Sequence, residues 1–209
     1  LKELEGRDIV DLIDEKQIDV KTWGNGIGLI SLEVRRLVSH PITVRIPVGT
    51  FFVSENPLSQ NMISTMSRKE TLTADDRQTI EQPVACANRM KRIPLSKDTF
   101  TIHRAPQQGD LARLMPVLER ATPATKPWQD PYDFERLRVE SFRRFTGQSP
   151  LQRFETNDAV RQAAVWIVTD NADLSDLGAL VLTTSSNPIG GAKAIHEHEA
   201  ARAMKICNE

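Results

Sequence analysis

The chain has 209 residues, of which 39% are apolar and 26% charged, and its 27 basic and 28 acidic side chains give a formal net charge of −1. This composition indicates a soluble globular protein with enough residues for one large domain or two small ones. Up to Arg104 there are 15 basic against 14 acidic residues, and after it 12 against 14. Nucleic-acid binding through a broad basic face is therefore disfavoured, because such binding depends on many phosphate contacts.

No stretch approaches the roughly 18 consecutive apolar residues that a membrane span needs. The first residues, LKELEGRDIVDL, are acidic and lack an apolar core, so no signal peptide is visible and the compartment stays open. The chain begins with Leu and stops inside a helical pattern. We therefore expect a fragment or a processed product of a longer protein.

The first half of the chain predicts one short helix and then strands. Residues 7–16 place four apolar side chains on one helical side, and residues 17–23 alternate as a strand does. Two further runs alternate strictly, with a turn at "SHP" between them, and we expect them to form a hairpin with one buried face. The apolar residues of these runs are Ile30, Leu32 and Val34, and Ile42, Val44 and Ile46.

Further strand-like runs lie around residues 51–53, 80–86 and 99–102. Six or seven short strands without an intervening long helix favour an antiparallel β-sandwich with an immunoglobulin- or fibronectin-like layout. We assign residues 1–104 to this domain.

After residue 108 the period changes from two to 3.6. Residues 110–121 place Leu111, Leu114, Met115 and Leu118 on one stripe behind a candidate N-cap, Asp110. Similar patterns follow at 131–145, 157–171, 173–182 and the C-terminus. Residues 109–209 thus predict an all-α domain, a helical bundle or a stack whose layout resembles HEAT or armadillo repeats, and we expect its C-terminus to be truncated. The overall class is α+β.

One cluster of cations is a candidate site. Arg89, Lys91 and Arg92 follow a strand-like run and can hold an anion or an acidic partner peptide, since arginine suits paired oxygens. A solvated loop face is the alternative interpretation.

Other motifs give no catalytic or metal signature, and no cofactor is expected. "GNGIG" at residues 24–28 has Leu29 where a dinucleotide-binding turn needs its third glycine, and a strand follows where that turn needs a helix, so it predicts a tight β connection instead. Cys86 with His103 is a remote candidate for a thiolate pair. Cys86 and Cys207 are expected to be buried thiols outside any disulfide, with one inter-domain disulfide as the alternative.

The last residues, 185–209, combine a Pro-Ile-Gly-Gly run with two histidines. On a helix His196 and His198 stand about 200° apart, so one metal ion could not take both of them. Ala200, Ala203 and Cys207 instead form part of an apolar stripe. We expect a flexible connection and an amphipathic helix here.

These observations favour a non-catalytic protein-interaction, adaptor or scaffold module, whose partner is another protein or a missing part of its own chain. A small-molecule ligand stays open. One alternative is an enzyme with its site in an inter-domain cleft, which requires at least three of His103, Cys86, Arg89, Lys91 and Arg92 to converge on one concave pocket. The other is an excised structural fragment of a multidomain protein.

Overall fold

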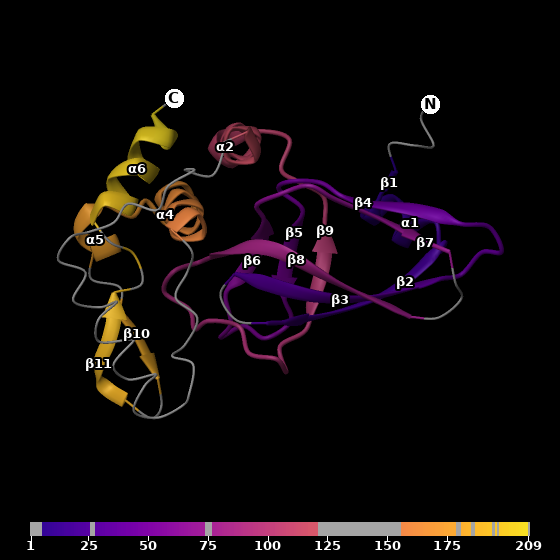
Figure 1. Ribbon diagram of the computed structural model, residues 1–209, viewed down its shortest axis with the longest axis horizontal. Helices are drawn as coiled ribbons and strands as arrows, with labels where there is room; N and C mark the ends of the chain where they lie inside the picture. Colours follow the sequence, from indigo (N-terminus) through magenta and orange to yellow (C-terminus); the bar gives the residue numbers. More distant parts are fainter. Residues whose placement is uncertain are drawn as a thin grey trace.

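The computed structural model describes residues 6–25, 28–73, 77–120, 156–178, 181–184, 187–193, 195 and 197–208 (Figure 1). Its first part contains β1 (Arg7–Asp8), α1 (Ile9–Asp14), β2 (Ile18–Gly24), β3 (Leu29–Arg36), β4 (Ile42–Ile46), β5 (Phe51–Ser54), β6 (Asn61–Ser64), β7 (Arg68–Leu72), β8 (Gln78–Ala87) and β9 (Phe100–His103). Its second part contains α2 (Gly109–Arg120), α4 (Thr156–Asp170), α5 (Leu174–Gly178), β10 (Val181–Thr184), β11 (Asn187–Lys193) and α6 (Glu197–Cys207).

Six strands form one nearly closed antiparallel sheet, which we call the barrel. Their order is β2-β3-β8-β6-β5-β9. Strand β8 joins the two halves of the barrel, because its residues up to Pro83 pair with β3 and those from Val84 onward pair with β6. Proline has no N–H to donate to a ladder, so its position suits the point where β8 exchanges one neighbour for another.

The barrel closes where β9 returns to β2. An isolated antiparallel bridge joins Trp23 to Thr99. Next to it the buried hydroxyl of Thr22 donates to the carbonyl of Phe100 and accepts a hydrogen bond from the N–H of the same residue. At this seam the Thr22 side chain therefore makes the hydrogen bonds that the main chain of a neighbouring strand makes elsewhere in the barrel.

The buried faces of the strands are those that the alternating sequence predicts. Ile30, Leu32 and Val34 of β3 are fully buried, and Leu32 lies between Thr22 of β2 and Ile80 of β8 in the register. The same holds for Ile42, Val44 and Ile46 of β4. The prediction of one apolar face on each of these strands is confirmed.

The predicted hairpin of β3 with β4 is wrong. Strand β4 lies in a second sheet, of order β1-β4-β7, where it pairs with β1 in parallel and with β7 in antiparallel orientation. Side chains of β3 and β4 nevertheless enter the same hydrophobic cluster. Alternation defines which side chains are buried but not which strand lies alongside, so both arrangements satisfy the sequence. Helix α1 is confirmed and contacts both sheets through β2 and β4, with Asp8 capping its first turn.

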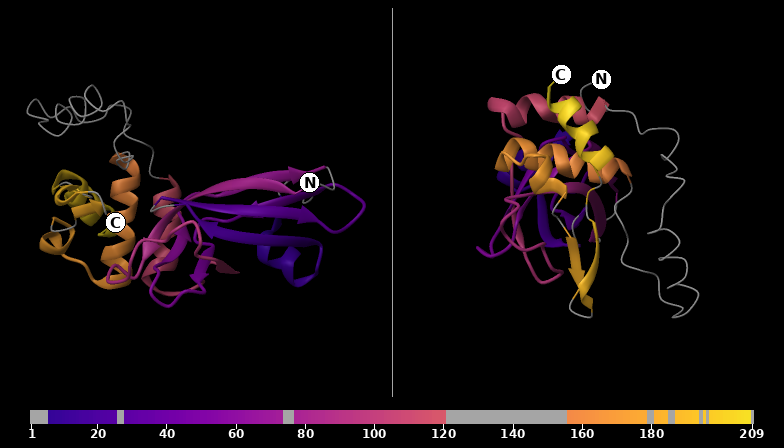
Figure 2. Two further views of the ribbon diagram at one scale, coloured as in Figure 1. Left: turned by 90° about the horizontal axis from the view of Figure 1, so that it is seen from below. Right: turned by 90° about the vertical axis from the view of Figure 1, so that its left-hand side faces the viewer.

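The structure confirms a mixed α+β protein, but an immunoglobulin-like sandwich is not confirmed. Six strands lie in one nearly closed sheet, and the second sheet, β1-β4-β7, contains a parallel pair, whereas that sandwich packs two antiparallel sheets face to face. A HEAT- or armadillo-like helical stack is not confirmed either. The helices α2, α4, α5 and α6 gather at one end of the barrel, opposite α1 (Figures 1 and 2).

Helix α4 is the central element of this helical end. Every side chain from Ala163 to Trp166 is buried, since α4 contacts α2 and α6 as well as β8. Ala85 and Ala87 of β8 are buried too. Small side chains on both elements let helix and strand approach closely. The predicted apolar stripe of α6 is found at Ala200 and Ala203, which are fully buried, and α6 packs on α4.

Residues 109–209 are not helical throughout. The antiparallel hairpin of β10 and β11 lies between α5 and α6, where the sequence predicted the end of a helix and a flexible connection. Pro188, Gly190 and Gly191 are uncommon residues in strands, which is why the sequence did not predict this hairpin. The helix predicted at 131–145 and the residue His196 lie outside the described residues. The division into two domains stays a prediction.

Candidate functional site

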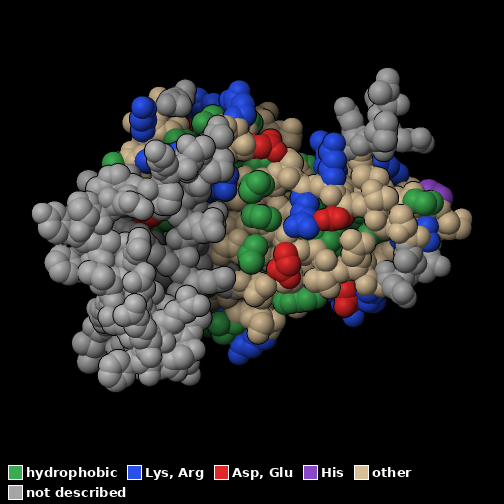
Figure 3. Space-filling model, in the orientation of Figure 1, with side chains coloured by type: hydrophobic (Ala, Val, Ile, Leu, Met, Phe, Trp, Pro, Cys, Tyr) green, Lys and Arg blue, Asp and Glu red, His purple; other side chains and the backbone are tan. Residues whose placement is uncertain are grey.

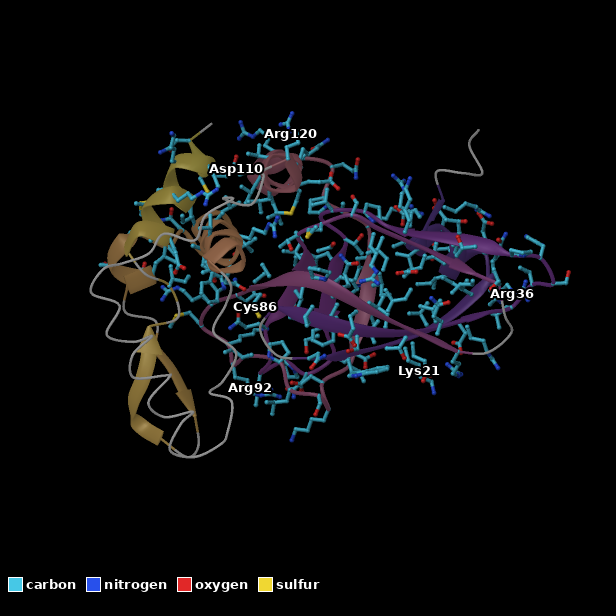
Figure 4. All side chains as sticks on the ribbon, in the orientation of Figure 1. Lys21, Arg36, Cys86, Arg92, Asp110 and Arg120 are labelled. Atoms are coloured by element: carbon cyan, nitrogen blue, oxygen red, sulfur yellow. The ribbon has the colours of Figure 1, made fainter. Side chains whose placement is uncertain are left out.

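Two loops lie side by side at one rim of the barrel, residues 55–60 between β5 and β6 and residues 88–98 between β8 and β9. We call them the loop surface. The N–H of Arg92 donates to the carbonyl of Leu58 (3.1 Å), and the N–H of Gln60 donates to the carbonyl of Arg92 (3.0 Å). A parallel bridge between Ser59 and Arg92 accompanies these bonds. Figure 4 shows Arg92 at the lower rim, below Cys86 in this view.

Asp98 connects the parts of the loop surface. Its carboxylate is 1% exposed and accepts four hydrogen bonds: two from the guanidinium of Arg92 (2.6 and 2.7 Å), one from the N–H of Leu95 (2.7 Å) and one from the Asn56 amide (2.9 Å). The Arg92 contact, helped by the other donors, holds the pKa of Asp98 well below its usual range, against the opposing effect of burial. The carboxylate is therefore ionised at neutral pH and fixes both loops.

Each exposed apolar residue of the loop surface sits on a hydrogen-bonded turn. The side chain of Asn56 accepts from the N–H of Leu58 (3.1 Å). Met90 lies inside the turn closed by the bond from the N–H of Lys91 to the carbonyl of Asn88 (2.9 Å). These turns hold apolar side chains out into solvent, although nothing in a turn requires leucine or methionine.

The stretch "GNGIG" contributes to this rim through Gly24. A Cβ atom built on Gly24 would lie 2.8 Å from the carbonyl oxygen of Leu95 and 2.9 Å from the Cβ of Pro94. Glycine is needed here because the loop surface packs directly against the end of β2. Gly26 and Ile27 lie outside the described residues.

The three predicted anion-site cations are placed differently from one another. The main-chain N–H of Arg89 donates to Asp170 (2.9 Å), and its guanidinium donates to Asp176 of α5 (2.9 Å). Arg89 therefore fastens the loop surface to the helical end. Arg92 is held by Asp98. Both arginines already bind carboxylates, so only the third cation of the predicted site has an uncommitted side chain.

That third cation is Lys91. Its side chain is exposed and, within the described part of the chain, forms no ion pair, and the same is true of Lys97. The carbonyl of Lys91 accepts a hydrogen bond from the buried Gln60 amide (2.9 Å), which fixes the main chain beneath the lysine. Anion binding by this loop stays a prediction. The positive charge available for it lies on Lys91 and Lys97.

Cys86 and His103 are not brought together. In the register Cys86 of β8 lies opposite Met62, Met62 opposite Phe52, and Phe52 opposite Ile102 of β9. Three strand-to-strand spacings, roughly 14 Å across the sheet, therefore separate Cys86 from Ile102. His103 is the next residue and points to the opposite face, so Cys86 and His103 do not form the thiolate pair considered from the sequence.

Cys86 is instead a structural residue beneath α4. Its N–H donates to the side-chain oxygen of Gln162 (2.7 Å), and its carbonyl accepts from the nitrogen of the same amide (2.7 Å). Burial raises the pKa of the Cys86 thiol, which disfavours the nucleophilic thiolate. Neither Cys86 nor the half-buried Cys207 is part of a disulfide.

Within the described ranges, no group of three or more His, Cys, Asp or Glu side chains has the arrangement of a metal site. None of the helices described there is long and apolar enough to cross a membrane. On the barrel face visible in Figure 3, acidic, basic and hydrophobic side chains alternate without one sign prevailing.

The exposed apolar residues and Asp98 were not foreseen from the sequence. The turn residues in "SENPLSQN" and "PLSKD" indicate loops, and a leucine inside such a loop is the available signal for an exposed apolar side chain. That signal is weak, because leucines in loops also fold back into cores.

No protein-family model matches the sequence, and no curated protein or solved structure is significantly similar to it.

Proposed function

We propose that this protein is a non-catalytic interaction module, acting as an adaptor or scaffold, and that it binds another protein through the loop surface. One observation carries the proposal. The three most exposed large apolar side chains of the described residues, Met90 (85%), Leu58 (70%) and Leu95 (49%), all belong to the loop surface. Single exposed apolar residues need no explanation, but a concentration of the most exposed ones on two connected loops supports a binding surface.

The energies involved are sufficient for recognition. Complete burial of a leucine or methionine side chain contributes about 1.5–3 kcal/mol, so three of them can supply the centre of a moderate interface. Binding also costs free energy when flexible loops become ordered. The hydrogen bonds around Asp98 and Gln60 have already ordered these loops, which lowers that cost.

The rest of the fold supports this use. Gly24 packs beneath the loops, and Arg89 ties them to α5, so the loops are fastened to both the barrel and the helical end. A main chain fastened in this way supports an interface whose backbone changes little on binding.

The test compares proteins retained from cell extract by three forms of the chain. The first is the wild type, the second carries L58S, M90S and L95S, and the third carries L37S and M66S. Leu37 and Met66 are also exposed (47% and 41%) but lie outside the loop surface, so the third form is a matched control.

We expect at least one protein to be retained by the wild type and the control and to be lost from the triple variant. The purified partner should then bind the wild type directly, with an affinity at least tenfold above that for the triple variant. Identical retention by all three forms would refute the proposal.

A further inference from the structure

We propose that the loop surface recognises an acidic protein segment in which apolar side chains alternate with carboxylates. This inference rests on the proposed function and adds the chemistry of the partner. It depends on which charges of the loop surface remain available once its internal ion pairs are counted.

The loop surface is more basic than the chain as a whole. Residues 55–60 and 88–98 contain four cations and two carboxylates, a net charge of +2, whereas the chain carries −1. Arg89 and Arg92 are committed to Asp176 and Asp98. The exposed Lys91 and Lys97 therefore provide the positive charge that a partner meets.

The lysines flank the apolar side chains along the loop. Lys91 follows Met90 directly, and Lys97 stands two residues after Leu95. In Figure 3 blue and green side chains lie next to each other at the lower rim, where Figure 4 places Arg92. A partner that fills the apolar positions thus brings its neighbouring side chains close to ammonium groups, which favours Asp and Glu there.

The number of available cations distinguishes a protein segment from other anionic partners. Nucleic acid binding relies on many phosphate contacts, and anionic membranes are bound by clusters of four to eight basic residues. Two uncommitted lysines are few for either surface. They suffice to select acidic side chains around an apolar contact, where shape and burial supply most of the affinity.

Glu55 gives the surface an acidic border. Its carboxylate is exposed and accepts a hydrogen bond from the hydroxyl of Thr99. A basic residue of the partner would form its ion pair with this carboxylate, at the 55–60 loop. The partner segment is therefore expected to carry its acids opposite residues 90–97, and not evenly along its length.

The experiment selects from a displayed library of random dodecapeptides on the wild-type protein, after depletion on the L58S, M90S and L95S variant. We expect the enriched peptides to contain at least two acids and two large apolar residues. Their binding should fall about tenfold in the double variant K91E, K97E and should weaken as salt is raised from about 50 to 300 mM.

The control is the double variant K21E, K69E, which reverses two exposed lysines of β2 and β7 outside the loop surface. It should bind the peptides as the wild type does. All four substituted lysines are exposed, so a thermal unfolding scan should show folded proteins with similar midpoints.

Enriched peptides without acids, or binding unchanged by K91E and K97E, would overturn the inference and leave the proposed function standing. Failure to enrich any peptide that distinguishes the wild type from the apolar triple variant would overturn both. Sedimentation with phosphatidylserine vesicles, lost in that triple variant, would assign the surface to membranes and also overturn the inference.

Discussion

Arg92 and Asp98 pair through the two terminal guanidinium nitrogens and both carboxylate oxygens, with Nη1 2.6 Å from Oδ2 and Nη2 2.7 Å from Oδ1. Two-pronged geometry of this kind gives direction as well as attraction. Since Asp98 also holds Leu95 and Asn56, the pair determines the shape of both loops of the loop surface. A cation that the sequence suggests for ligand binding is thereby a structural one.

We predict that replacing Asp98 by Asn makes unfolding less dependent on pH. The pKa of Asp98 in the folded protein is lowered below its unfolded value of about 3.9, chiefly by the Arg92 contact. A lowered pKa contributes stability above the unfolded value, and this contribution is lost as the pH falls below about 4. Urea midpoints between pH 7 and pH 2.5 should therefore fall more for the wild type than for D98N, which should start lower at pH 7. Parallel curves would contradict the prediction. D110N is the control, because that carboxylate on α2 is 70% exposed.

Replacing Gln162 by Leu should destabilise the protein by about 3 kcal/mol. The substitution keeps a side chain of similar size but removes both hydrogen bonds that the Gln162 amide makes with the main chain of Cys86, and the loss of each such buried bond costs about 1–3 kcal/mol. Urea unfolding measures the loss. Q107L removes an exposed amide and should change the free energy of unfolding by less than about 0.5 kcal/mol. Equal effects of the two substitutions would show that the Cys86 contact adds nothing.

Replacing Thr22 by Val tests the seam of the barrel. Valine has nearly the same shape, but the N–H and the carbonyl of Phe100 lose the hydroxyl that serves both. We expect a loss of about 1–3 kcal/mol and faster hydrogen exchange at the Phe100 amide. T101V, at an exposed position of β9, is the matched control. Unchanged exchange at Phe100 would mean that the closure does not depend on Thr22.

The two cysteines should differ in reactivity. Cys86 is fully buried and Cys207 half-buried, and desolvation raises the pKa of both thiols. With iodoacetamide at pH 8, peptide mass spectrometry should find slow modification of Cys207 in the native protein. Cys86 should react only after denaturant is added. Comparable native rates for the two residues would show that α4 opens from β8.

Local sequence patterns predicted the individual helices and strands better than they predicted which strands pair with each other. The faces of β3 and β4, the helix at residues 9–14 and the stripes of α2 and α6 follow from periodicity, because burial of one face leaves a mark in the sequence. The pairing of β4 with β7 does not, since it depends on strands whose own signals are short and polar. The closure of the barrel rests on single contacts such as Thr22 with Phe100, which no periodicity records.

The candidate site was predicted only in part. Three cations in "RMKR" indicated an interaction site, yet their charge alone could not show that Arg89 and Arg92 have internal carboxylate partners. Asp176 lies 87 residues after Arg89. Exposure of Met90 and Leu58 likewise depends on the path of the loops and not on the residues themselves.

Gln162 has a consequence for the behaviour of the protein at high concentration. Among the described residues, the ladder with β3 ends at Pro83 and the N–H of Val84 donates to Gly28, so the β8 residues after Val84 have no strand beside them on that side. Open edges can pair with strands of other molecules and start aggregation. Gln162 occupies the polar groups of Cys86 at this edge and brings the bulk of α4 over it. Loosening this contact would therefore expose strand-edge groups that can pair with other molecules.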